Sequence, residues 1–157
     1  MRHLNMGKTM AKLKELGIIL PPVPALQGNY ILYKRVEQYI YLSGQSAFVN
    51  GIALYPGKVG NDVTVEQAYL AARETGLLCL SILQQAAGDL DKIDIVKVLG
   101  FVACTPEFNE HPKVLNGLSD LFVEVLGERG RHARSAIGSN QLPFNCCVEI
   151  EMMARIL

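Results

Sequence analysis

The sequence predicts an α+β fold in which two helices pack on one face of a mixed β-sheet. Stretches with apolar residues three to four positions apart alternate with short runs rich in β-branched residues, in the order β-β-α-β-α-β-β and with no internal repeat. A chain of 157 residues, half of them apolar, is long enough for a sizeable core. We expect a single domain over residues 1–157, with an N-terminal extension and connector over 1–24 and the core over 25–157.

The N-terminal extension begins with a predicted helix over residues 8–16, which has one apolar stripe and is followed by Gly17 as its C-cap. Prolines between residues 21 and 24 exclude a regular helix, because proline fixes φ and lacks an amide donor, and they favour an extended connector. Tyr30 is predicted to open a strand that ends at Val36.

A second strand over residues 39–42 is predicted to form a hairpin with the first and to end at Ser43-Gly44-Gln45. Small residues at such a place let a ligand or another backbone approach closely, and an ordinary bulge or turn explains them equally well. Residues 46–62 are rich in glycine and proline and predict a long loop with one short strand at 52–54. Loops of this length often border a functional site.

The clearest helix covers residues 64–87. Thr64 with Gln67 three positions later is a capping-box signature, and Gly88 is a natural stop. The centre of this segment is apolar on most sides, so the helix is expected to be deeply buried.

The second half of the chain contains three predicted strands and one helix. Residues 94–104 are rich in β-branched residues and predict a central strand, and apolar spacing over 112–126 predicts a helix that Gly127 ends. Two further strands, over 133–138 and 147–153, are joined by a polar turn that contains proline.

These last two strands contain the best chemical lead in the sequence. Arg134 shares a strand face with small residues only, whereas Glu149 and Glu151 point away from the apolar residues of their strand. Two neighbouring strands of this kind can bring an anion-binding guanidinium and a proton-handling carboxylate onto one wall of a pocket. From the residues alone, Arg134 and Glu149 would as readily form a structural ion pair.

Charge and hydropathy exclude several classes of partner. The formal net charge is zero, which argues against nucleic acid as the main partner and gives no reason to expect an anionic membrane surface. No apolar run approaches the thickness of a bilayer, and the N-terminus lacks a signal-type apolar core, so we expect a cytoplasmic protein.

The cysteines and histidines predict no structural metal. Cys79 and Cys104 lie in apolar patterns where cysteine usually acts as a small buried hydrophobe. The neighbouring Cys146 and Cys147 are poorly placed to bridge each other. His3, His111 and His132 are scattered, with no further ligand at metal-binding spacing.

Three segments together resemble the RidA family of reactive enamine/imine deaminases, which is also called the YjgF family and was formerly labelled endoribonuclease L-PSP. They are Gly28-Asn29-Tyr30 with Ser43-Gly44-Gln45, the strand over 97–102 followed by Leu115-Asn116, and Ala133-Arg134-Ser135 with Val148-Glu149-Ile150-Glu151. Their order and spacing carry the resemblance, which covers about residues 25–155.

The resemblance implies a chorismate-mutase-like α+β fold, assembled as a homotrimer with clefts between subunits. It also implies hydrolysis of 2-aminoacrylate-type enamines and imines, which pyridoxal-phosphate enzymes release, to 2-keto acids and ammonia. No cofactor is expected, because a protonated imine is already electrophilic.

The same resemblance assigns roles to individual residues. Arg134 corresponds to the arginine that binds the substrate carboxylate, and its planar guanidinium suits that task. Glu149 corresponds to the catalytic carboxylate that orients the attacking water. Tyr30 and Asn116 correspond to pocket-lining positions, and Ser43-Gly44 to the loop that packs near the bound ligand.

The chain departs from the family pattern in ways that bear on the substrate. His132 and Asn29 stand where the family commonly has proline, and Ala136 stands where several members have cysteine. The N-terminal segment and the 46–62 loop are longer than in compact members. These changes keep the arginine and the glutamate but alter the shape of the pocket.

Three functions are compatible with these observations. The first is the deaminase, and the second is a binding module that holds a small 2-keto acid or amino acid without turning it over, and that senses this ligand or regulates a partner enzyme. The third is an endoribonuclease, which the neutral charge and the lack of a histidine pair or a basic aromatic stripe disfavour.

Overall fold

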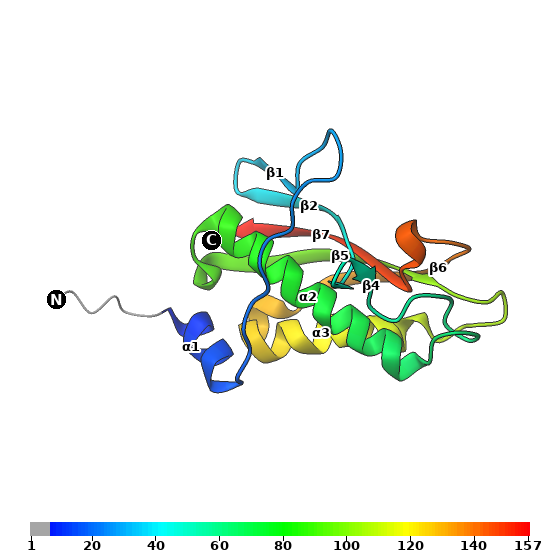
Figure 1. Ribbon diagram of the computed structural model, residues 1–157. Coiled ribbons are helices and arrows are strands. Elements are labelled where there is room, and N and C mark those ends of the chain that lie inside the picture. The colour runs from blue at the N-terminus through cyan, green and yellow to red at the C-terminus, as the bar shows by residue number, and fades with distance from the viewer. Residues whose placement is uncertain (1–6) are drawn as a thin grey trace.

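The computed structural model describes residues 7–157 as a β-sheet covered on one face by helices (Figure 1). The helices are α1 (Lys8–Glu15), α2 (Val65–Ala87) and α3 (His111–Leu126). The five strands of the main sheet are β1 (Tyr33–Val36), β2 (Tyr39–Gln45), β5 (Ile93–Ala103), β6 (Ala133–Ser139) and β7 (Val148–Ile156). A separate hairpin consists of β3 (Phe48–Val49) and β4 (Ile52–Ala53).

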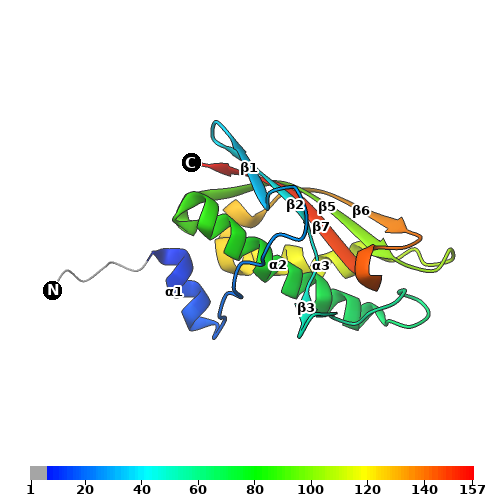
Figure 2. The ribbon, with the colours of Figure 1, turned by 45° about the horizontal axis from the view of Figure 1, so that its top comes forward.

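The main sheet is mixed, as the sequence predicts, with the strand order β1-β2-β7-β5-β6. Neighbouring strands are antiparallel except β5 and β6, which are parallel because α3 crosses over between them. The last strand, β7, lies in the middle of the sheet between β2 and β5, and β6 forms one edge. The turned view in Figure 2 shows α2 and α3 side by side beneath the strands.

The core lies between the sheet and the two long helices. The capping box predicted at the start of α2 is present, with the Gln67 amide donating to Thr64 Oγ1 at 3.1 Å, and Gly88 ends the helix with φ of 76°. The centre of α2 is buried on most sides, because it packs on both the sheet and α3. At the crossing, the backbone of α3 approaches α2 so closely that any side chain at Gly117 would collide with the carbonyl of Tyr69.

Two of the predicted elements differ from the structure. Tyr30 does not open a strand, since β1 begins at Tyr33 and Tyr30 lies in a bend with 50% of its surface exposed. The ladder between β1 and β2 ends at the Tyr33–Leu42 pair, where β2 begins to bulge relative to β7 between Leu42 and Gln45.

The 46–62 segment contains two short strands instead of the single strand predicted at 52–54. Asn50 and Gly51 both have positive φ, 52° and 79°, and form the tight turn between β3 and β4. An Asn-Gly pair between apolar residues is a strong hairpin signal, and it is the signal that the sequence interpretation missed.

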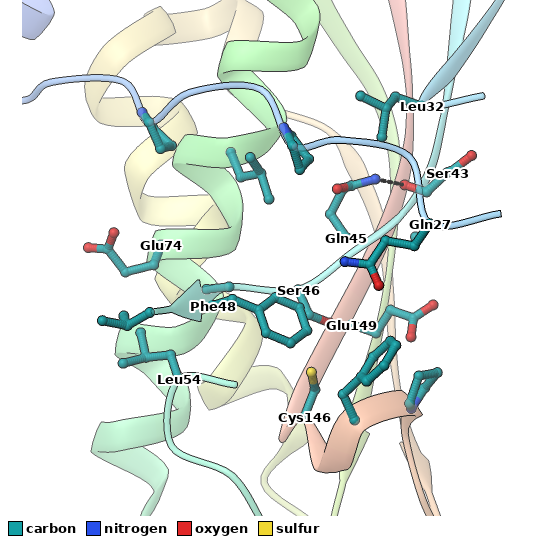
Figure 3. Close-up of a pocket in the computed structure, with 18 of the residues that line it drawn as sticks. Gln27, Leu32, Ser43, Gln45, Ser46, Phe48, Leu54, Glu74, Cys146 and Glu149 are labelled. Carbon is teal, nitrogen blue, oxygen red and sulfur yellow. Dashed lines mark hydrogen bonds between the residues drawn. The ribbon is translucent and has the colours of Figure 1, made fainter. Parts of the chain in front are cut away.

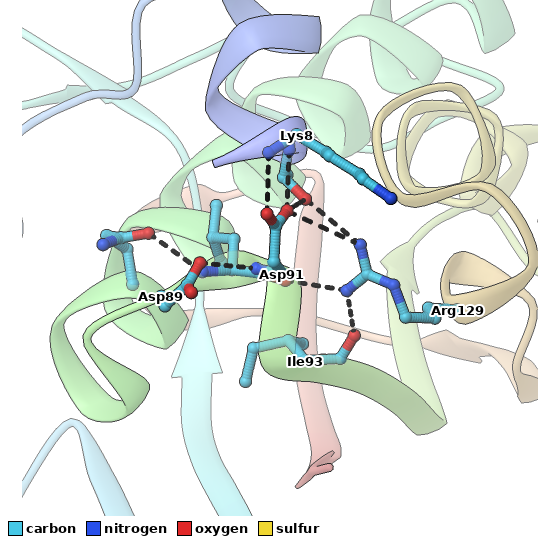
Figure 4. A network of polar contacts seen from close by, with 8 residues as sticks. Lys8, Asp89, Asp91, Ile93 and Arg129 are labelled. Atoms are coloured by element: carbon cyan, nitrogen blue, oxygen red, sulfur yellow. Dashed lines mark hydrogen bonds and ion pairs between the residues drawn. The ribbon is translucent and has the colours of Figure 1, made fainter. Parts of the chain in front are cut away.

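The N-terminal helix is held to the rest of the fold by a carboxylate that is distant in sequence (Figure 4). Asp91 accepts hydrogen bonds from the backbone amides of Lys8 and Thr9, both at 2.7 Å, and from the Thr9 hydroxyl at 2.5 Å. Arg129 donates to Thr9 Oγ1 and to the carbonyls of Leu90 and Ile93. Asp91 therefore caps α1, whose own N-cap residue offers no side-chain hydrogen bond.

We expect Asp91→Asn to lower the free energy of unfolding by about 1–2 kcal/mol, because the helix loses a charged cap. The Thr9 hydroxyl and the amides hold the pKa of Asp91 below its usual value, so the stabilisation is present above the ordinary carboxyl pKa and disappears as the pH falls through the lowered one. Urea unfolding of both proteins at neutral and acid pH measures this, with exposed Glu107→Gln as the control. Equal stability of Asp91→Asn and wild type at neutral pH would contradict the capping role.

Candidate functional site

A cavity of about 1010 Å³ opens beside the bulged end of β2 (Figure 3). Its walls come from the 21–27 connector, from α2 and from the β3–β4 hairpin, and it reaches Glu149 on β7. In Figure 3, Glu74 and Leu54 lie on the α2 side of the cavity, whereas Gln27, Ser43 and Glu149 lie on the opposite side.

Glu149 is a half-buried carboxylate on the face of the sheet that points away from α2 and α3. It alternates with the buried residues Val148 and Ile150, which pack toward the helices. Gly44 lies directly against its carboxylate, so that a side chain there would collide with it. Burial raises the pKa of Glu149 above its usual value, and the nearby charge of Glu151 raises it further.

Two other predicted residues border the same cavity. Tyr30 contributes from the bend before β1, and Ser43 lies in the β2 bulge. The Ser43 hydroxyl donates to the Ile31 carbonyl at 2.6 Å, which fixes the side chain against the turn. Ser43-Gly44 therefore forms the predicted bulge, and its predicted approach to a ligand stays a prediction.

Arg134 lies elsewhere, near the start of the edge strand β6 and against α3. Its Nη1 donates to Asn116 Oδ1 and to Ser119 Oγ, both at 3.0 Å, and its Nη2 lies 3.4 Å from the Pro112 carbonyl. These acceptors are all neutral, and no ion pair found among residues 7–157 includes Arg134. A part-buried guanidinium with neutral partners is well suited to bind an anion.

His132 extends this network behind the guanidinium. Its Nδ1 lies 2.7 Å from the Gly130 carbonyl, which can only accept, so Nδ1 carries the hydrogen. Its Nε2 lies 3.0 Å from Ser119 Oγ and can accept from that hydroxyl, which in turn accepts from Arg134. Burial lowers the pKa of His132, and the positive charge of Arg134 lowers it further, which favours this neutral form.

The strand register places Arg134 and Glu149 on opposite faces of the sheet. Glu149 is opposite Phe101 on β5, and Phe101 is opposite Ile137 on β6. Arg134 precedes Ile137 by three residues, so its side chain points to the other face. The prediction that Arg134 and Glu149 lie on one wall of a pocket is therefore wrong for a single chain, and the two residues form no ion pair with each other.

The six residues predicted for the site thus fall into two clusters. Glu149, Ser43, Gly44 and Tyr30 meet at the cavity, whereas Arg134 and Asn116 meet at the edge of the sheet. The sequence interpretation missed Ser119 and His132 as partners of the arginine. Ser119 could have been predicted from its spacing on α3, because it lies three residues after Asn116 and so on the same helix face.

The cysteines and histidines form no metal-binding cluster within the described part of the chain, and His3 lies outside that part. Cys79, Cys146 and Cys147 are buried free thiols, as predicted for Cys79. Cys104 is only partly buried and lies 3.4 Å from His111 Nε2, although burial raises its pKa and so favours the thiol. No helix among residues 7–157 is long and apolar enough to cross a membrane.

We expect Glu149→Gln to stabilise the fold at neutral pH. A carboxyl group with a raised pKa in the folded state costs stability once it ionises, and this cost disappears below the ordinary carboxyl pKa, where both states are protonated. Thermal unfolding at pH 7.5 should show a higher Tm for Glu149→Gln than for wild type, with a smaller difference at pH 4. Exposed Glu151→Gln is the control, and a lower Tm for Glu149→Gln at pH 7.5 would contradict the burial argument.

Comparison with known proteins shows similarity along almost the whole chain. Residues 10–156 match the family model described as "YjgF/chorismate_mutase-like, putative endoribonuclease". The chain is 39% identical to Protein TCP17 of Trypanosoma cruzi over 152 residues, which are 96% of this chain and 95% of that protein.

Two solved structures extend the comparison. The Agrobacterium tumefaciens protein Atu1372, described as of unknown function, is 42% identical, with a TM-score of 0.85 and coverage of 95% of this chain and 92% of the other. RidA from the Antarctic bacterium Psychrobacter is 25% identical, with a TM-score of 0.58 and coverage of 85% and 94%.

Proposed function

Because the chain belongs to the YjgF/chorismate mutase-like family, we propose that it hydrolyses reactive 2-aminoacrylate-type enamines and imines to 2-keto acids and ammonia. The observation that carries the proposal is the half-buried Glu149, which lies against Gly44 in a cavity that Tyr30 and Ser43 also border. A carboxylate with a raised pKa accepts a proton more readily than an ordinary carboxylate, which suits a group that accepts and returns one.

In the proposed reaction, Glu149 handles the protons of a water molecule. The carboxylate accepts one proton as the water oxygen bonds to the imine carbon, which gives a carbinolamine. Glu149 then returns that proton to the nitrogen and accepts the hydroxyl proton of the carbinolamine as the carbon–nitrogen bond breaks, so that ammonia leaves as the keto group forms. The negative charge of Glu149 also favours the protonated, electrophilic form of the imine.

Arg134 is proposed to bind the substrate carboxylate with donors that Asn116 and Ser119 do not occupy. Nη1 is engaged by those two acceptors, which fixes the plane of the guanidinium, and Nη2 has only the longer contact to Pro112. An Asn116 side chain that accepts from Arg134 acts as a positioning residue in this proposal.

The separation of Arg134 from Glu149 supports a site that two copies of the chain share. The face of the sheet opposite the helices carries partly exposed apolar side chains, among them Tyr41 at 47% and Ile137 at 45%. An apolar sheet face of this kind is a natural surface for a second copy. We propose a closed homotrimer, in which Arg134 of one copy faces Glu149 of its neighbour across the bound substrate.

The first test asks whether Glu149 is catalytic. With 2-aminoacrylate generated by a serine or cysteine lyase, Glu149→Gln should slow keto-acid release about 10²–10⁴-fold, because it removes the acid–base group but keeps its shape. Calorimetric affinity for a 2-keto acid should survive. Glu151→Gln, on the same strand face, is the matched control and should keep its rate.

Wild-type protein that binds keto acids but does not accelerate keto-acid release would favour the binding-module alternative. Equal rates for the two glutamine variants would remove Glu149 from the reaction.

The second test asks whether copies share the site. Arg134→Ala and Glu149→Gln should each be inactive alone, and Arg134→Lys should not restore activity because a point charge cannot bind bidentately. Co-refolding equal amounts of Arg134→Ala and Glu149→Gln should recover about a quarter of the wild-type activity, since random mixing restores both groups in about one site of four.

No recovery from a mixture that sedimentation shows to contain mixed oligomers would contradict the shared site. A stable monomer at micromolar concentration would contradict the assembly as well.

A further inference from the structure

The cavity beside Glu149 has an apolar compartment that a short-chain substrate does not need. A 2-iminopropanoate has about six non-hydrogen atoms, whereas a cavity of about 1010 Å³ is at the upper end of the range for drug-sized ligands. The polar groups gather at the Glu149 end of the cavity, where Gln27, Ser43 and Gln45 lie (Figure 3).

The compartment on the α2 side is lined mainly by apolar side chains. They are Val23, Phe48, Leu54, Leu70 and Leu78, together with the prolines of the connector. Among residues 7–157, no lysine, arginine or histidine lines this cavity, and the exposed Glu74 lies at its α2 side. A second carboxylate group of a ligand is therefore disfavoured there, and an apolar group is favoured.

Two segments outside the main sheet form much of the wall of this compartment. The connector belongs to the long N-terminal segment, and the β3–β4 hairpin belongs to the long 46–62 segment. The connector is fixed in place, because the Ser81 hydroxyl of α2 donates to the Pro21 carbonyl at 2.7 Å and the prolines restrict its backbone. The wall is therefore built in advance of binding.

We propose that the preferred substrates are 2-imino acids with a branched or aromatic apolar side chain, which enters the compartment between α2, the connector and the β3–β4 hairpin. The proposal rests on the deaminase function, since it places the imine carbon at Glu149 and the carboxylate on the Arg134 of a neighbouring copy. The imine carbon carries the nitrogen, the carboxylate and the side chain. With the first two placed in this way, the side chain points toward Leu70 and Phe48.

A substrate series tests this preference. An L-amino acid oxidase generates the imines of alanine, leucine and phenylalanine in place, and the protein's kcat/KM for keto-acid formation is measured for each. Each extra methylene that a fitted pocket accepts typically contributes ten-fold or more, so the leucine or phenylalanine imine should exceed the alanine imine by at least about ten-fold. Equal or lower values for both large imines would overturn the proposal.

A variant with a charged side chain in the compartment tests the same preference from the side of the protein. Leu70 lies on α2 with 45% of its surface exposed, so Leu70→Asp is compatible with folding. It should lower the ratio of large-imine to alanine-imine kcat/KM by about ten-fold or more, because the apolar side chain would meet a charge. Val123→Asp, on α3 at 37% exposure and outside the cavity, is the control and should leave the ratio unchanged.

Calorimetry separates failure of this proposal from failure of the proposed function. Binding of phenylpyruvate and pyruvate is compared for wild type, Leu70→Asp and Val123→Asp. If no imine is hydrolysed but phenylpyruvate binds more tightly and Leu70→Asp removes that difference, the compartment is confirmed and the deaminase function fails. If the alanine imine is hydrolysed and neither assay prefers the large side chain, the function stands and the compartment proposal is overturned.

Discussion

The position of β7 between β2 and β5 is the constraint on which the rest of the structure depends. Both edges of this strand are paired, so its register cannot slip by one residue without exchanging its two faces. Val148, Ile150 and Met152 consequently face the helices and are buried. The same alternation sends Glu149 to the opposite face, so the residues that build the core also place the candidate catalytic carboxylate.

In the helix layer, the neighbouring residues Asn116 and Gly117 likewise serve both the packing and the candidate site. Glycine inside a helix costs about 1 kcal/mol relative to alanine, and here the close approach of α2 at Tyr69 requires it. The close packing holds α3 in a fixed position, and the preceding residue, Asn116, then reaches the edge of the sheet and accepts from Arg134. One local departure from good helix chemistry thus serves both the packing of the helices and the orientation of the guanidinium.

The sequence predicted the elements whose signals are local and strong. The capping box of α2, the apolar spacing of α3 and the alternation in the last strand all depend on neighbours within a few positions, and the structure has each of them. The strand predicted from Tyr30 begins only at Tyr33, because its ladder with β2 ends at the Tyr33–Leu42 pair, where β2 begins to bulge, and no local pattern at Tyr30 reveals this. Asp91 as the cap of α1 could not be predicted either, since the contact spans 83 positions along the chain.

The candidate site was predictable as a set of residues but not as an arrangement. Alternation within each strand correctly places Arg134 and Glu149 on the face opposite to their sequence neighbours. Whether the two residues share a face depends on how β6 and β7 each pair with β5. The expectation that the two groups share one wall assumed adjacent strands. In the sheet β5 lies between β6 and β7, and the register puts the two side chains on opposite faces.

Keeping the arginine and the glutamate apart within one chain has a chemical consequence for the proposed reaction. A guanidinium in contact with Glu149 would lower the pKa of the carboxyl group, whereas burial without a cation raises it. Arg134 in turn has only neutral acceptors among the described residues, so its charge is not neutralised by the protein. In the proposed reaction, a substrate carboxylate between the two groups would compensate the charge of Arg134 and leave Glu149 free to act as the base. The sheet therefore keeps apart, within one chain, the two groups to which the proposed reaction gives separate roles.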